Sequence, residues 1–291
     1  SQSGTIRYVT NKPDPSGFSS QVDVEVGTTK GGEESYDISG HVNIPLTDNV
    51  AIRAVGFYAR EGGYVDNVPG LNLSGTADNS DAVEEDWNDH ETTGGRLAGL
   101  WRINPQWDAS LSFVSQYSDT NGDWLTDPSV GDYKIVSFFD EYRDDDWYQT
   151  SASVTGDLGF AELTATASWF EREIEYQWDN TLYENWRTAQ SRNEGWSGLY
   201  DTAYYGGTIF NFQEQNRWTY EVRLTSQGET RLQWMAGAFY EDVWDWWHYG
   251  GKVPDLMSTQ TWATANYYAI YYGADQVPIA PTDEYYTNFF E

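Results

Sequence analysis

Segments that are apolar at every second residue alternate along this chain with connections of two very different lengths. The tight turns fall at Thr47–Asn49, Asn104–Gln106, Gly156–Gly159 and Ser226–Glu229. Most of the other connections are far longer and cover about residues 62–91, 119–146 and 173–216. Tight turns at one end and long loops at the other are typical of an outer-membrane β-barrel wall. The pattern therefore predicts an all-β antiparallel meander that is part of a transmembrane barrel with long extracellular loops.

Nine wall strands pass the test of period-two alternation. They are expected at about residues 21–26, 36–44, 50–60, 93–102, 109–118, 148–155, 161–169, 220–225 and 232–241. One face of these strands is apolar and the other is rich in Ser, Thr, Gln and Glu, as expected of a wide, wet lumen. A packed sandwich would fill that second side with apolar groups.

Several expected strands have nine or more residues, which is the length that crosses a bilayer at a tilt. After Glu241 no tenth strand follows, and the remaining segment is polar and aromatic. Nine strands would leave an unpaired edge, which exposes backbone N–H and C=O groups and is very costly in hydrocarbon. The chain is therefore expected to be a piece of a larger barrel.

Composition agrees with this architecture. Aromatic residues make up 17% of the chain, with 15 Trp and 22 Tyr, while the mean hydropathy is polar at −0.68. Lipid-facing barrels have this combination because only alternate residues must be apolar and aromatic girdles lie at both interfaces. Aromatic-rich glycan-binding proteins have it as well, so composition alone does not decide between the two.

Charge and residue usage exclude several function classes. The net charge is −30, which repels phosphate backbones and argues against a nucleic-acid partner. The absence of Cys excludes disulfides, thiolate metal sites and Cys nucleophiles. No signal peptide opens the chain, so in an exported protein Ser1 would not be the start of the gene. Residues 256–274 are too polar for a transmembrane helix, which leaves strands as the means of insertion.

Five stretches resemble the TonB-dependent outer-membrane receptor family, and they occur in the family's order. Ser1–Asp14 (SQSGTIRYVTNKPD) resembles the last strand of the family's plug domain, and residues 1–13 are expected to form a strand that ends at Pro13. The others resemble barrel strands and the loop after the third strand; they are Gly40–Leu46 (GHVNIPL), Ala51–Tyr58 (AIRAVGFY) with Gly62–Pro69 (GGYVDNVP), Tyr220–Ser226 (YEVRLTS) and Arg231–Tyr240 (RLQWMAGAFY).

The resemblance implies a location in the bacterial cell outer membrane, in contact with its lipid. Complete family members are 22-stranded barrels with an N-terminal plug and a TonB box, which contacts the TonB–ExbB–ExbD complex. They import bulky nutrients such as ferric siderophores, cobalamin, haem or oligosaccharides. Residues 1–17 would be the end of the plug and a linker, and residues 18–291 the N-terminal part of the barrel. The TonB box, most of the plug and about thirteen strands are absent, so transport is expected of the parent protein.

Catalytic motifs are not found, and we expect neither an enzyme nor a bound cofactor. Only three His are present, and they form no H-E-x-x-H motif. Ser197 lacks the spacing of a nucleophile elbow. No metal centre is predicted, although Asp119–Asp123 has a weak similarity to a calcium loop. The acidic runs at residues 84–86 and 140–146 are either solvated loop acids or part of a surface Ca²⁺ site.

Aromatic residues in or near the expected outward loops are the candidate ligand-binding residues, because flat rings flanked by acids and amides stack on sugars or on aromatic ligands. They are Trp87, Trp124, Trp178, Tyr183, Trp186, Trp196, Trp244, Trp246 and Trp247. An interfacial girdle and packing between loops are the alternative explanation. The girdle itself is expected to include Trp169, Trp234 and Tyr240 on the lipid-facing side. The expected lumen-lining residues are His41, Arg53, Arg96, Glu162, Glu221 and Arg223.

The leading interpretation is a fragment of a TonB-dependent receptor that binds a small-molecule nutrient in its extracellular loops. Two alternatives stay open. A soluble carbohydrate-binding β protein would fold in water without detergent. A passive porin has no plug, and the similarity at residues 1–13 argues against it.

Overall fold

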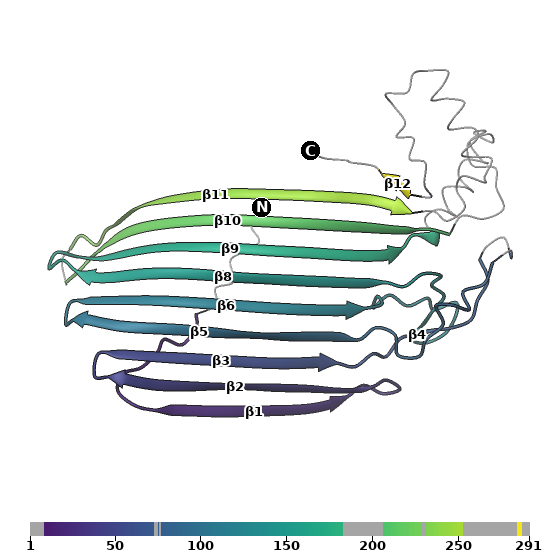
Figure 1. Cartoon of the computed structure of the whole chain (residues 1–291), viewed down its shortest axis with the longest axis horizontal. Coiled ribbons are helices and arrows are strands. Elements are labelled where there is room, and N and C mark those ends of the chain that lie inside the picture. The colour runs from purple at the N-terminus through teal and green to yellow at the C-terminus, as the bar shows by residue number, and fades with distance from the viewer. Residues whose placement is uncertain are drawn as a thin grey trace, which may run out of the picture.

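The computed structural model describes residues 9–72, 75, 77–182, 206–228, 231–252 and 284–286. Most of these residues form one antiparallel sheet in which each strand pairs with the next along the chain (Figure 1). In order across the sheet, its strands are β1 (Ser19–Thr28), β2 (Glu34–Thr47), β3 (Val50–Glu61), β5 (His90–Asn104), β6 (Trp107–Asn121), β8 (Tyr142–Asp157), β9 (Ala161–Asp179), β10 (Thr208–Ser226), β11 (Met235–Lys252) and β12 (Glu284–Tyr286). The predicted all-β meander is confirmed, and the sheet is not closed into a barrel.

Short polar side chains form the tight turns at one end of the sheet. The Thr47 hydroxyl accepts hydrogen bonds from the backbone N–H of Asn49 and Val50. Asn104 Oδ1 accepts from Gln106 N, two residues later, in the same way. Such local bonds replace the ladder bonds that the chain loses where it reverses direction. Three of the four predicted turns lie where expected, whereas the connection after Ser226 extends to residue 234.

The last strands are longer than the alternation predicts. β9 and β10 have 19 residues each and β11 has 18. The prediction ended the corresponding strands near Trp169 and Glu241 and began another near Tyr220, because acidic and amide residues interrupt the apolar pattern beyond these points. The backbone ladder continues through these residues at the loop end, so residues 242–252 are strand where an irregular segment was expected.

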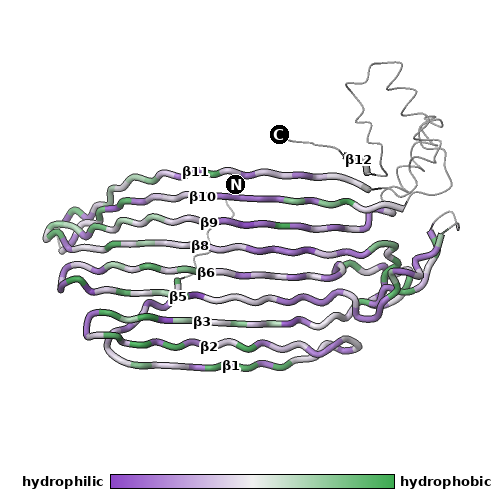
Figure 2. Tube along the Cα trace, viewed as in Figure 1, coloured by the Kyte–Doolittle hydropathy of each residue, from purple (hydrophilic) through white to green (hydrophobic). Residues whose placement is uncertain are grey.

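The sheet has the reverse of the usual burial pattern, because its apolar face is the more exposed one. Val22 of β1 is 73% exposed and Leu111 of β6 is 59% exposed. On the other face Asn43 is fully buried, and the hydroxyls of Ser112 and Ser151 lie 2.9 Å apart across two strands. Figure 2 shows hydrophobic and hydrophilic residues alternating along the strands. An apolar surface of this extent marks contact with a membrane or another protein.

The segment before β1 crosses the polar face instead of pairing with a strand (Figure 1). The side-chain amide of Asn43 donates to the carbonyls of Asp14 and Gly17, both at 2.8 Å, and Arg96 Nη1 donates to the carbonyl of Asn11 at 3.0 Å. The prediction of a strand up to Pro13 is therefore wrong for residues 9–13. Residues 1–8 lie outside the described residues. Within the described ranges, no helix has the length and apolarity that crossing a membrane requires.

Two long connections, residues 62–89 and 122–141, pack together at the end of the sheet opposite the tight turns (Figure 1). We call them the loop assembly. The short strands β4 (Asp66–Asn67) and β7 (Lys134–Ile135) join the two connections in a parallel pair. Asn67 is 1% exposed and its side-chain amide donates to the carbonyls of Ala82 and Ser137. Buried amides therefore hold this assembly together where apolar side chains would form a core in a soluble domain.

Candidate functional site

A pocket of about 520 Å³ opens where the loop assembly meets the ends of β3, β5, β6 and β8. Its lining comes from the β1–β2 turn, from the strand ends and from both connections of the loop assembly. The lining residues are Glu33, Arg60, Glu84, Glu85, Asp86, Trp87, Asp89, Asp119, Asn121, Gly122, Asp140, Glu141, Tyr142 and Asp144. Nine of these residues are acids and one is a cation, so we call it the acidic pocket.

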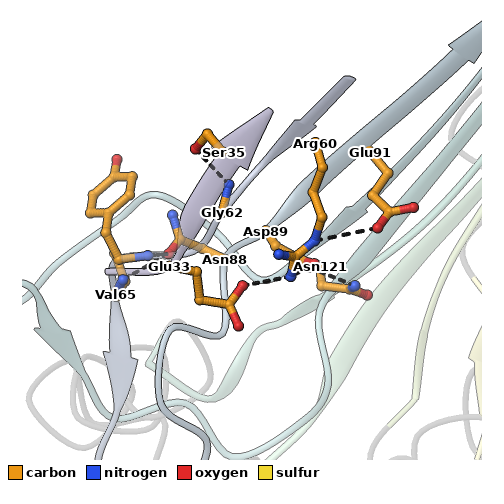
Figure 3. A network of polar contacts seen from close by, with 10 residues as sticks. Glu33, Ser35, Arg60, Gly62, Val65, Asn88, Asp89, Glu91 and Asn121 are labelled. Atoms are coloured by element: carbon orange, nitrogen blue, oxygen red, sulfur yellow. Dashed lines mark hydrogen bonds and ion pairs between the residues drawn. The ribbon is translucent and has the colours of Figure 1, made fainter. Parts of the chain in front are cut away.

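Arg60 holds one side of the acidic pocket in place. It lies at the end of β3, and its guanidinium forms ion pairs with Glu33 at 2.5 Å, with Asp89 at 2.9 Å and with Glu91 at 3.3 Å (Figure 3). Asn121 at the end of β6 donates its amide N–H to Asp89 at 2.8 Å. These contacts connect the β1–β2 turn to three strand ends. The one cation of the lining is therefore already engaged by carboxylates.

Seven carboxylates of the lining have no ion-pair partner among the described residues. They are Glu84, Glu85, Asp86, Asp119, Asp140, Glu141 and Asp144. Charges of one sign around a partly enclosed space focus the electric field and raise the local concentration of counter-ions. The acidic pocket is therefore an attractive environment for a cation.

In the loop assembly, burial perturbs the carboxyl groups of Asp86 and Glu141. Burial raises the pKa of Glu141 to about 7, with added repulsion from Asp179 and Asp123, although a hydrogen bond from the backbone N–H of Asp179 lowers it. Burial also raises the pKa of Asp86, and the neighbouring charges of Asp66, Glu33 and Glu85 add to that rise. Both shifts reflect the cost of placing a negative charge in a poorly hydrated acidic environment.

Among the described residues, no hydrogen-bond partner is found for three buried polar atoms of the lining residues: Asp86 Oδ1, Trp87 Nε1 and Glu141 Oε2. The other oxygen of Glu141 accepts a hydrogen bond from Asp179 N at 3.0 Å. A buried polar atom without a partner costs about 1–3 kcal/mol, and such atoms are rare in folded proteins. All three atoms belong to residues that line one pocket, which makes it the candidate site.

The structure corrects the role expected for Trp87. It lies in the loop assembly, as predicted, but it is only 5% exposed, so its ring faces are not open for stacking on a ligand. The ring packs against Gly122, where the backbone has φ +63° and an added Cβ would lie 2.9 Å from Trp87 Cε2. Trp124, in the same assembly, is 71% exposed and presents its ring to solvent. Tyr183, Trp186 and Trp196 lie outside the described residues.

Four of the other predicted loop aromatics lie on strands. Trp178 is at the loop end of β9, and its ring stacks on Tyr176 with centroids 4.9 Å apart. Trp244, Trp246 and Trp247 lie within β11 and are 43–53% exposed. Period-two alternation places Trp247 on the polar face and the other two on the opposite face. The three rings therefore do not form one stacking surface.

Aromatic residues form a continuous row across the apolar face, which we call the aromatic belt. Neighbouring ring centroids in this row lie 5.1–6.3 Å apart, within the usual range for aromatic pairs. Its members are Phe113, Tyr148, Trp169, Trp218, Tyr220 and Tyr240. The row contains Trp169 and Tyr240, two of the expected girdle residues. The third, Trp234, lies just before β11, where its backbone bonds Ser226 at the turn end.

The six residues expected to line a lumen share the polar face of the sheet, as the strand registers show. They are His41, Arg53, Arg96, Glu162, Glu221 and Arg223. Arg223 forms an ion pair with Glu221 at 3.3 Å, and Arg96 contacts the segment before β1. Both arginines therefore make contacts within the protein. Within the described residues, no group of three or more His, Asp or Glu is arranged to hold a metal ion.

The sequence indicates most of the acids of the pocket but not that they form a pocket. The sequence predicts solvated loop acids or a calcium site at residues 84–86 and 140–146, and nothing in it indicates that the two runs meet. Arg60 was missed as an organising residue because the alternation of its strand is blurred. Glu33 lies in a short turn that carried no signal. The one available clue was the contrast between many acids and a single nearby arginine.

No protein-family model matches the sequence, and comparison with curated proteins finds no relative. Among solved structures, the fold is similar to the crystal structure of the siderophore receptor PiuA from Acinetobacter baumannii, with a TM-score of 0.53 and 14% sequence identity. The match covers 83% of this chain and 32% of the receptor chain, so this chain spans about a third of that protein. At this identity the similarity concerns the fold alone.

Proposed function

We propose that this chain is part of a TonB-dependent outer-membrane receptor that imports a bulky nutrient, either a ferric siderophore or an oligosaccharide. The observation that carries the proposal is the reversed burial of the sheet, with an exposed apolar face crossed by the aromatic belt. A lipid bilayer is the environment in which that face is stable. The similarity in fold to a siderophore receptor supports the same conclusion.

Strand lengths and loop positions fit this function. Outward residues of β9 are apolar from Leu163 to Trp169 and acidic from Glu171 to Glu175. The strand therefore extends well beyond the apolar band on the side of the loop assembly. The acidic pocket lies on that side, where a nutrient would arrive from the medium. The polar face would line the interior, and the segment at residues 9–17 would lead from a plug domain into the barrel.

In the proposed mechanism, the loop assembly binds the nutrient first. Rearrangement of the plug, driven through the TonB–ExbB–ExbD complex, then admits the nutrient along the polar face to the periplasm. The residues described here serve the first step by presenting charges and hydrogen-bonding groups at fixed positions. Arg60 and the buried amides of the loop assembly fix those positions by tying the loops to one another and to the strand ends.

The test is uptake by a bacterium that expresses the full-length protein and lacks its own receptors for the cargo. Labelled ferric chelates and labelled oligosaccharides are supplied to cells with and without a functional TonB protein. We expect uptake of one cargo class, recovery of the protein in the outer-membrane fraction, and loss of uptake when TonB is deleted. Uptake that persists without TonB would indicate a passive porin. Recovery of the protein in the soluble fraction would contradict the proposal.

A further inference from the structure

We propose that the acidic pocket selects cargo that carries a positively charged amino group next to oxygen acceptors. This inference rests on the proposed function and names the chemistry that the receptor recognises. Two sources share this chemistry: an amino sugar and a ferric chelate with a pendant amine. The aromatic residues were the first candidates for ligand recognition, but the geometry assigns that role to the carboxylates.

The charge of the pocket is the first argument. Seven carboxylates of its lining have no ion-pair partner among the described residues, and the guanidinium of Arg60 is already shared among three acids. An anionic cargo such as a phosphate or a carboxylate-rich chelate would be repelled. An ammonium group would offset the repulsion and gain charge-assisted hydrogen bonds, which are shorter and stronger than neutral ones.

The unpartnered atoms are the second argument, and they are independent of the charge count. Trp87 lines the pocket and is only 5% exposed, yet its indole N–H has no acceptor within the part of the chain that the structure describes. Asp86 Oδ1 and Glu141 Oε2 are buried in the same lining without a donor. The matching ligand donates N–H groups to the carboxylates and accepts from the indole. An ammonium group beside a hydroxyl or carbonyl oxygen has that combination, whereas a bare cation cannot accept a hydrogen bond.

The size of the pocket agrees with a polyatomic group. A volume of about 520 Å³ lies within the range of small-molecule sites, which is about 300–1,000 Å³. The pocket can therefore admit the charged group together with the ring or chain that carries it. The rest of a bulky cargo would remain outside, against the exposed part of the loop assembly near Trp124.

The experiment compares charged and uncharged versions of the same cargo. Binding to the full-length protein in detergent is measured by calorimetry at pH 7.5. One pair of probes is kanamycin A and its fully N-acetylated derivative, and the other is ferrioxamine B and its N-acetyl derivative. Acetylation removes the positive charge in both pairs and keeps the rings or the iron chelate. We expect the charged member of one pair to bind about tenfold or more tightly than its acetylated partner. The pair that shows the difference identifies the source.

Variants connect the preference to the pocket. Glu141→Gln and Asp86→Asn should each bring the ratio between charged and acetylated probes close to one. Asp48→Asn, an exposed acid in a tight turn at the opposite end of the sheet, should leave the ratio unchanged. Should a pocket variant not fold, salt provides a second test on the unmodified protein. Binding of the charged probe should weaken about tenfold between 50 and 500 mM NaCl, while binding of the acetylated probe should not change.

Equal binding of the charged and acetylated members in both pairs would overturn the inference, as would failure of all four probes to bind. A preference that survives in both pocket variants would overturn it as well. TonB-dependent uptake of the acetylated probes without any charge preference would leave the proposed function standing and the inference refuted. The failures of the two proposals are therefore distinguishable.

Discussion

The long strand β9 has two halves that present opposite chemistry on the same face. In β9 the turn-side half has Leu163, Ala165 and Ala167 on the apolar face and ends at Trp169 of the aromatic belt. The loop-side half places acids on that face, beginning at Glu171. The backbone ladder continues across the change without interruption. The change therefore reflects a change of surroundings rather than a change of fold.

One continuous sheet can therefore lie partly at a boundary between lipid and water and partly in water alone. In the turn-side half, the regular alternation of apolar and small polar residues matches a boundary between lipid and water. In the loop-side half, both faces are in water, and structure depends on specific polar contacts such as those of Asn67 and Arg60. A charged substitution on the apolar face should therefore destabilise the protein strongly in the turn-side half and only slightly in the loop-side half.

The largest expected effect comes from a charge placed on the apolar face. Val222→Lys in β10 should destabilise the folded protein in lipid by about 2–4 kcal/mol, because the ammonium group would lie in hydrocarbon. Val222 is 48% exposed, so the same substitution would be nearly neutral if water covered this face. Reversible urea unfolding in lipid vesicles measures the difference.

The matched control is Glu214→Lys, on the same face of the same strand but on the loop side of the belt. It should change stability by less than about 0.5 kcal/mol. If the two lysine variants lost the same free energy of unfolding, the two halves of the strand would not lie in different environments.

A second prediction concerns the amide core of the loop assembly. Asn67→Ala should leave the carbonyl of Ala82 and the backbone N–H of Ser137 without their partner, while the carbonyl of Ser137 keeps the amide of Asn79 as a donor. The loss should loosen the loop assembly locally by about 1–3 kcal/mol, while the sheet keeps its protection. Hydrogen exchange resolved by peptide reports both regions at once. Asn49→Ala, in an exposed tight turn, is the control and should change neither. Loss of protection throughout the sheet would show that the two regions are not independent.

The smallest predicted effect is a pH dependence of the loop assembly. The pKa of Glu141 is about 7 in the folded protein and is raised mainly by burial. Since the unfolded chain releases this proton near its ordinary pKa, the folded state holds the proton more tightly. The stabilisation is complete below that ordinary pKa and is lost as pH rises to about 7. Exchange protection of residues 122–141 should fall over this range, and Glu141→Gln should flatten the profile. Protection that rises with pH would contradict the assignment.

Much of the fold was predictable because the sheet repeats a simple rule. Alternation and turn chemistry located the wall strands, and small polar side chains such as Thr47 and Asn104 marked the reversals. The prediction failed where that rule stops applying. Beyond Trp169 the outward residues are acidic, so no apolar period marks the continuing strand. Residues 9–13 have strand-like composition, but the carbonyl of Asn11 accepts a hydrogen bond from the side chain of Arg96, which period alone cannot reveal.

The candidate site was harder to predict, because it is assembled from distant segments. Glu33, Asp86 and Glu141 lie far apart in the chain and meet only because consecutive strands end at the same edge. The burial of Trp87 depends on a close approach of the backbone at Gly122, which composition does not indicate. Exposed aromatic residues suggested ligand stacking, while the informative groups were buried polar atoms without partners.

The most direct test of the account is a nitroxide scan of β10 in lipid vesicles. The chain contains no Cys, so single cysteines at residues 219–224 can be labelled without interference from native thiols. Power-saturation electron paramagnetic resonance then measures collisions with oxygen, which concentrates in lipid, and with a water-soluble nickel chelate. If the apolar face contacts lipid, the two accessibilities alternate, with oxygen favoured at Tyr220, Val222 and Leu224 and nickel favoured at Thr219, Glu221 and Arg223. Preferential nickel access at all six positions, or the opposite phase, would contradict it.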